Sequence, residues 1–136
     1  MEQKINFSKE NISNNELLEL EQSIGYKLPL SYKKFILKNN GGVPDNEYFD
    51  EVKISSFSPI KYGNNTVEKT YEIFKTLIPK GYLPIADDIG GWPICLDLNE
   101  GNTYGFVYLV HMDGPEIDFV AESFKEFLEG LTDEYI

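Results

Sequence analysis

Three segments of the chain combine a capping pattern with apolar residues at helical spacing, and this feature most constrains the fold. The patterns are Ser13-Asn14-Asn15-Glu16, Asn65-Thr66-Val67-Glu68 and Ser123-Phe124-Lys125-Glu126. In a capping box, the first side chain accepts a hydrogen bond from the backbone N–H three residues later, and the glutamate reaches back to the first N–H. The sequence therefore predicts a helix after each pattern.

Each predicted helix has apolar side chains on one face, because residues at i, i+3, i+4 and i+7 share a side of an α-helix. The three apolar sets are Leu17, Leu20 and Ile24; Val67, Tyr71, Phe74 and Ile78; and Phe124, Phe127, Leu128 and Leu131. A further helix is expected from about Ser31 to Asn40, with Tyr32, Phe35 and Ile36 buried. Gly25, Gly41-Gly42 and Pro79-Lys80-Gly81 are expected to end helices.

Apolar residues alternate with a period of two in other parts of the chain, which is typical of strands. Pro93 to Leu98 and Phe106 to His111 flank a polar turn and predict an antiparallel hairpin. On one face we expect Ile94, Leu96 and Leu98 with Val107 and Leu109, and on the other Cys95, Asp97, Phe106 and Tyr108. Tyr48 to Phe57 and Ile117 to Val120 are further strand candidates. The prediction is an α+β fold, a mainly antiparallel sheet packed with helices, in one domain of residues 1–136.

Acidic residues exceed basic ones, and the excess lies in the second part of the chain. The 136 residues contain 12 Lys and 23 Asp or Glu, a net charge of 12 − 23 = −11, and no Arg. From Tyr82 to Ile136 there are twelve acids and one lysine, Lys125. Nucleic acids and anionic lipids repel such a surface, so we expect neither as a direct partner. Lys27, Lys33, Lys34 and Lys38 are interpreted as a solvated face.

The chain has one cysteine, Cys95, and one histidine, His111, which excludes an internal disulfide and a Cys/His zinc site. No stretch approaches the ~18 apolar residues that a membrane span requires, and Met1 to Asn6 lacks a basic region followed by an apolar run. We expect a cytoplasmic protein.

Three polar clusters have both a chemical and a simpler interpretation. Asp87-Asp88 before Gly90-Gly91 suggests an acid pair, but Asp and Gly are also common turn residues, and adjacent strand residues face opposite ways. His111-Met112-Asp113 suggests a general base, but Cys95 lies on the opposite face of the predicted hairpin. Asp113 to Asp118 lacks the spacing of a calcium loop. We therefore expect no catalytic residues, no metal and no cofactor.

Three blocks of the sequence resemble the SUKH superfamily, the Smi/Knr-type domains. The first is Gly25 to Ile36 followed by Asn39-Asn40-Gly41-Gly42; the second is Ile85 to Gly91 with Ile94 to Leu98; the third runs from Ala121 to Leu131. Trp92-Pro93 departs from the family pattern, in which smaller polar residues often follow the glycines. The resemblance implies an α+β fold. In bacteria it also implies an immunity protein that neutralises a polymorphic toxin, often a nuclease, whereas the fungal relatives are regulators of cell-wall synthesis.

Joined to the localised acidity, the resemblance predicts a surface that binds the basic catalytic domain of a cognate toxin. Aromatic side chains fill pockets on a partner, and charge speeds the encounter and selects the partner. The predicted contact residues are Asp87, Asp88, Trp92, Asp97, Glu100, Asp113, Glu116 and Asp118, with Asp45, Glu47, Tyr48 and Asp50 as a second candidate loop. The alternative is a regulatory interaction module without a toxin partner.

Overall fold

Each of the three capping patterns precedes a helix. The computed structural model describes residues 3–135 and contains the helices α1 (Asn14–Ile24), α2 (Leu30–Lys38), α3 (Val67–Phe74) and α4 (Phe124–Glu129). At α1 both bonds of the capping box are present, and Gly25 ends the helix in the left-handed conformation, with φ of 81°. At α3 the cap is one residue later than predicted, because Thr66 and not Asn65 accepts from the N–H of Lys69.

Six antiparallel strands form the main sheet in the order β3-β4-β5-β6-β7-β8, so every strand pairs with its neighbour in sequence. The strands are β3 (Tyr48–Phe49), β4 (Val52–Phe57), β5 (Tyr82–Asp88), β6 (Pro93–Asp97), β7 (Val107–Val110) and β8 (Ile117–Ala121). A separate pair consists of β1 (Ile5–Asn6) and β2 (Val43–Pro44). The α+β class with a mainly antiparallel sheet is confirmed.

The predicted hairpin has the expected register. Ile94 pairs with Leu109, Cys95 with Tyr108 and Leu96 with Val107. The first and third of these pairs belong to the main buried cluster, whereas Cys95 belongs to a second cluster with Ile78 and Val110. The alternation of apolar residues therefore specified which side of this hairpin faces the main core.

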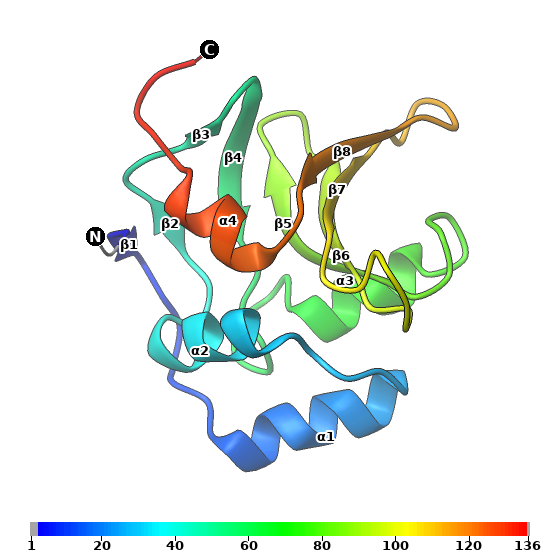
Figure 1. Cartoon of the computed structure of the whole chain (residues 1–136). Helices are drawn as coiled ribbons and strands as arrows, with labels where there is room; N and C mark the ends of the chain where they lie inside the picture. The colour runs from blue at the N-terminus through cyan, green and yellow to red at the C-terminus, as the bar shows by residue number, and fades with distance from the viewer. Residues whose placement is uncertain (1–2, 136) are drawn as a thin grey trace.

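The sheet is strongly curved, and its two sides are covered by different helices (Figure 1). Helix α4 packs against β8 and α2, and α3 packs against β5. On the α4 side, the ring of Phe35 lies with its centroid 4.9 Å from that of Phe57 and 5.1 Å from that of Phe124. Aromatic pairs of this kind contribute about 0.5–1.5 kcal/mol beyond the area they bury. They fix α2 and α4 to the inner side of the sheet.

Strands β1, β2 and β5 were not predicted from the alternation. Strand β5 contains four consecutive buried residues, Leu83 to Ala86, and therefore shows no period of two. It nevertheless occupies a central position, between β4 and β6. Its last residues, Asp87 and Asp88, lead into the turn at the end of the sheet where the candidate surface lies.

Candidate partner-binding surface

A groove of about 1040 Å³ lies between the edge strand β8 and the hairpin of β3 and β4. We call it the acidic groove. Its lining residues come from five separate segments of the chain. They are Tyr48 to Lys53, Asp88 and Ile89, Leu109, Ile117 to Val120, and Tyr135. The groove thus joins parts of both predicted contact sets, because Tyr48 and Asp50 lie in it together with Asp88 and Asp118.

Four carboxylates line the groove, and they face one lysine. The carboxylates belong to Asp50, Glu51, Asp88 and Asp118, and the lysine is Lys53. The Nζ of Lys53 lies 5.7 Å from the centroid of the Tyr48 ring, which places its charge over the aromatic face. Like charges on facing walls add their fields, so the groove attracts cations.

Exposed apolar side chains accompany these carboxylates. The exposed fraction is 66% for Ile89, 40% for Ile117, 54% for Phe119 and 66% for Tyr135. The Tyr135 ring meets that of Tyr48 edge to face at 6.1 Å between centroids. Apolar side chains grouped in a polar surround are typical of sites that contact another protein.

Asp88 shapes the edge of the groove through a turn. Its Oδ1 accepts hydrogen bonds from the backbone N–H groups of Gly90 (3.0 Å) and Trp92 (2.8 Å). An aspartate that accepts from N–H groups two and four residues later stabilises a turn. The turn interpretation of Asp88 is confirmed, and this carboxylate has a structural role besides its charge.

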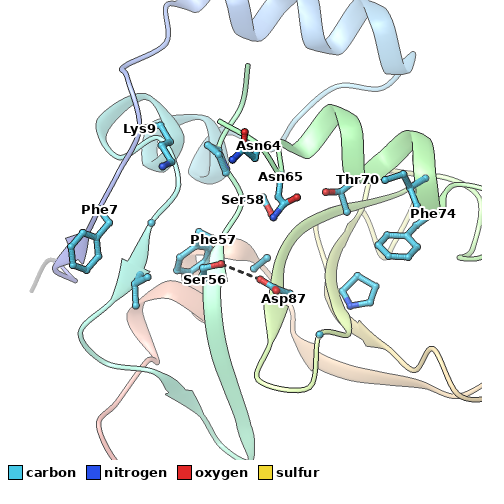
Figure 2. A pocket seen from close by; sticks show the side chains of 17 residues that line it. Phe7, Lys9, Ser56, Phe57, Ser58, Asn64, Asn65, Thr70, Phe74 and Asp87 are labelled. Carbon is cyan, nitrogen blue, oxygen red and sulfur yellow. Dashed lines mark hydrogen bonds between the residues drawn. The ribbon is translucent and has the colours of Figure 1, made fainter. Parts of the chain in front are cut away.

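Asp87 lies on the other side of the sheet from Asp88, in a separate cavity of about 510 Å³ between the sheet and α3. Figure 2 shows its carboxylate beside the hydroxyl of Ser56, which donates to Oδ1 at 3.2 Å. Burial raises the pKa of Asp87, and the bond from Ser56 opposes that rise. The two adjacent acids therefore form no catalytic pair, and Asp87 is not part of the acidic groove.

His111 lies next to the groove and holds three of the predicted residues together. Its Nε2 is 2.7 Å from Oδ2 of Asp118, and its Nδ1 is 3.8 Å from Oε2 of Glu116. The Trp92 ring lies over the imidazole, with centroids 4.3 Å apart. The hydrogen bond to Asp118 raises the pKa of His111, and the charge of Asp118 adds to the rise. His111 is thus a strand-end residue bonded locally, as predicted, although the carboxylate that orients it is Asp118 and not Asp113.

Two predicted contact residues do not belong to this surface. Asp97 is buried, at 4% exposure, and its carboxylate accepts from the N–H and the side-chain amide of Asn99 and from the hydroxyl of Thr103 (2.7 Å). The prediction that Asp97 contacts a partner is therefore wrong. Glu100 lines a different depression, beside the C-terminal end of α1. Both lie at the far end of β6, whose 5 residues span roughly 16 Å.

Three further predicted residues lie outside the lining of the groove. Asp113 is exposed in the loop between β7 and β8. Asp45 accepts a hydrogen bond from the side-chain amide of Asn6 at 2.6 Å, and Glu47 is half-buried just before β3. Of the predicted contact residues, the lining of the groove thus includes Tyr48, Asp50, Asp88 and Asp118.

Ten lining residues of the groove were not among the predicted contacts, and those with charged or exposed side chains are Glu51, Lys53, Ile89, Ile117, Phe119 and Tyr135. Glu51 follows the predicted Asp50 directly, so extension of that loop by one residue would have included it. Tyr135 offers no such signal, because the C-terminal segment reaches β3 through long-range contacts such as the bridge between Tyr48 and Thr132.

The geometry offers little support for a catalytic or metal-binding site. Burial raises the pKa of the Cys95 thiol, and Cys95 faces the cluster of Ile78 and Val110, so it is unsuited to act as a nucleophile. Within residues 3–135, no three His, Cys, Asp or Glu side chains are grouped so that they could hold a metal ion. Over the same residues, no helix has the length and apolar character that crossing a bilayer requires.

Comparisons with known proteins agree with the fold. The model of the SMI1 / KNR4 family (SUKH-1) matches residues 11–130. The SPbeta prophage-derived uncharacterized protein YokK of Bacillus subtilis (strain 168) is 29% identical over 149 aligned positions, which cover 91% of this chain and 77% of YokK. The uncharacterized protein YnaB of the same strain is 29% identical over 105 positions, 77% of this chain and 62% of YnaB. Because the family model covers most of the chain, from before α1 to the end of α4, the protein belongs to the SMI1 / KNR4 family (SUKH-1).

Proposed function

We propose that this protein is a cytoplasmic immunity protein that binds the catalytic domain of a cognate toxin and covers its active site. The observation that carries the proposal is the acidic groove, in which four carboxylates and several exposed apolar side chains face solvent together. Family membership and the expectation that it implies in bacteria support the same function. The similarity to a prophage-derived protein adds a relative from a mobile element.

The charge of the groove favours a basic toxin, and a nuclease is the class that fits best. A nuclease attracts phosphates with clustered lysine and arginine side chains, so its active site carries a positive field. Asp50, Glu51 and Asp118 present the opposite field from the two walls of the groove. A nuclease domain bound in the groove would have its phosphate-binding site covered, so nucleic acid could not enter. Neither protein would need to undergo a chemical reaction.

Apolar contact would supply most of the affinity. An interface of standard size buries about 1,600 Å², and a few central side chains dominate its energy. Tyr135 and Ile89 are exposed and line the groove. Phe119 is exposed at its edge, where its ring packs against those of Phe106 and Tyr108. Trp92 is half-buried against His111, so its ring is already ordered before a partner arrives. We assign Phe119 and Tyr135 as the apolar anchors of the interface.

The test is co-expression in bacteria with the protein encoded next to this one. Growth in the presence of that protein, together with a purified complex of the two chains, is the expected result. The test variant carries Asp118→Lys and Glu51→Lys; it should stay folded, with a lower melting temperature because the contact of Asp118 with His111 is lost, and it should lose both rescue and complex. Rescue that survives these two charge reversals would place the interface outside the groove.

A regulatory interaction module of the Smi/Knr type is the second candidate. The exposed apolar side chains of the groove would serve such a module equally well. Affinity purification of the tagged chain separates the two candidates, because immunity predicts one small basic partner and a regulatory module predicts several larger ones.

A further inference from the structure

Strand β8 ends the main sheet with an open edge. The opposite edge strand, β3, has 2 residues, and its backbone is bridged to Thr132 by two hydrogen bonds of 2.9 and 2.8 Å. Strand β8 has 5 residues and forms one wall of the acidic groove. Of the two ends of the sheet, only β8 thus has the length to accept a further strand.

The backbone pattern identifies which groups of β8 face the open edge. The N–H of His111 donates to the carbonyl of Glu116 at 3.0 Å, so these two residues form a hydrogen-bonded pair. The next pair is Val110 with Ile117, and Leu109 with Asp118 follows. Hydrogen-bonded and non-hydrogen-bonded pairs alternate in an antiparallel ladder. The N–H and C=O groups of Ile117 and Phe119 therefore point away from β7, toward the groove side.

The usual protections of a sheet edge are missing from this part of β8. Edge strands commonly carry lysine, proline or a bulge, which discourage pairing with another chain. Ile117, Asp118 and Phe119 include neither lysine nor proline, and the register shift lies at the other end of the strand, near Ala121. The only charged side chain of the three, Asp118, is held by His111. Ile117 and Phe119 remain 40% and 54% exposed.

A second copy of this chain fits this edge poorly, because pairing of β8 with itself would bring the carboxylates of two chains with net charge −11 together. A cationic chain fits well, because a strand laid along β8 would lie in the groove opposite Asp50 and Glu51. We propose that the partner inserts an extended segment carrying lysine or arginine side chains, which pairs with β8 as a seventh strand of the sheet. This inference rests on the proposed function, since it names the binding mode of the same groove.

A peptide probe tests the inference without the natural partner. The probe is a capped peptide of about eight residues in which Lys and Val alternate, long enough to pair with the whole strand. Backbone amide hydrogen exchange of the full chain is measured by NMR with and without the peptide. We expect slower exchange at Ile117 and Phe119 on binding, and loss of that effect when alternate peptide nitrogens of the probe are methylated.

Two variants at one position separate the backbone from the side chain. Phe119→Pro removes an N–H that faces outward and leaves the bonds to β7 in place, whereas Phe119→Ala removes the ring and keeps that N–H. We expect Phe119→Pro to bind the peptide about fivefold more weakly than Phe119→Ala, the effect of one lost hydrogen bond. Melting temperatures verify that both variants fold. If Phe119→Pro does not fold, the amide exchange of the unaltered chain with and without the peptide is the test of strand pairing.

Two results would overturn strand addition. One is peptide binding that leaves the amide exchange of Ile117 and Phe119 unchanged. That result would mean that the peptide binds in the groove without pairing with β8. The other is no binding at up to about 1 mM peptide. Neither result decides the proposed function, because growth rescue in the co-expression experiment tests it independently.

Discussion

The Nε2 of His111 lies 2.7 Å from Oδ2 of Asp118, and this contact connects the ends of β7 and β8 beside the acidic groove. The hydrogen bond raises the pKa of His111 above its ordinary value of 6.5. A raised pKa in the folded state means that protonated His111 stabilises the fold below the pKa of the unfolded chain. That contribution is lost as the pH rises through the higher pKa of the folded state.

We therefore predict that His111→Gln flattens the dependence of stability on pH. The free energy of unfolding of the unaltered chain should contain a component that declines as the pH rises from about 6.5 through the raised pKa of folded His111, and the variant should lack it. Urea unfolding at several pH values measures this, with Asp118→Asn expected to resemble His111→Gln. If stability depended on pH with the same slope in the variant and in the unaltered chain, proton binding at this contact would not be linked to folding.

Removal of charge from the groove should slow association with a basic partner. Asp50 has a left-handed backbone, with φ of 50°, so Asn is the suitable replacement there, whereas Glu51 accepts Lys. The pair Asp50→Asn and Glu51→Lys should lower the association rate about tenfold. The control pair, Glu10→Gln and Glu19→Lys, changes the net charge equally at exposed positions in and before α1. Stopped-flow mixing measures both, and equal slowing would mean that net charge matters and the groove does not.

Salt should slow the same association. Ions screen charges over about 10 Å at 0.1 M, so steering by the groove weakens between about 0.05 and about 0.5 M salt. The dissociation rate should change much less, because the apolar contacts of Phe119 and Tyr135 are not screened. An association rate that is independent of salt would exclude steering by these carboxylates.

Asp97 should contribute to stability and not to binding. Alanine at this buried position leaves the N–H groups of Asn99 and the hydroxyl of Thr103 without their acceptor. We expect a loss of about 1–3 kcal/mol in the free energy of unfolding, with unchanged affinity for the partner at temperatures where the variant is folded. Glu100→Ala is the control and should change stability by less than about 0.5 kcal/mol, because Glu100 is exposed. A weaker partner affinity of folded Asp97→Ala would contradict this assignment.

The elements with a clear period were predictable from the sequence. In the hairpin of β6 and β7, the alternation of Ile94 and Leu96 against Val107 and Leu109 gave both the strands and their register. Strand β5 was not predicted because Leu83 to Ala86 are all buried, so no alternation marks it. The caps at Ser13 and Ser123 were predicted correctly, whereas Asn65 and Thr66 are both good caps and only the structure shows which one acts.

The candidate surface was only partly predictable, because a sequence does not tell a solvated carboxylate from one bonded within a turn. Asp118 and Asp97 look alike in the sequence, yet one lines the groove and the other is buried. The pairing of β3 with Thr132 is a long-range contact that no local sequence pattern predicts. This pairing brings the ring of Tyr135 to that of Tyr48. The charge pattern of the sequence also did not separate Glu100 from the groove residues. Glu100 lies at the far end of β6, and this position depends on the direction of the strand.

The side chains of Asp50, Glu51, Ile89 and Tyr135 lie in the groove but outside the buried cluster that holds the helices to the sheet. Exchange of exposed residues such as these usually alters stability by less than about 0.5 kcal/mol. Under the proposed function, recognition through these four side chains would be largely separate from folding. Relatives with the same framework can diverge at the groove, and so acquire new partners, while the rest of the molecule is maintained.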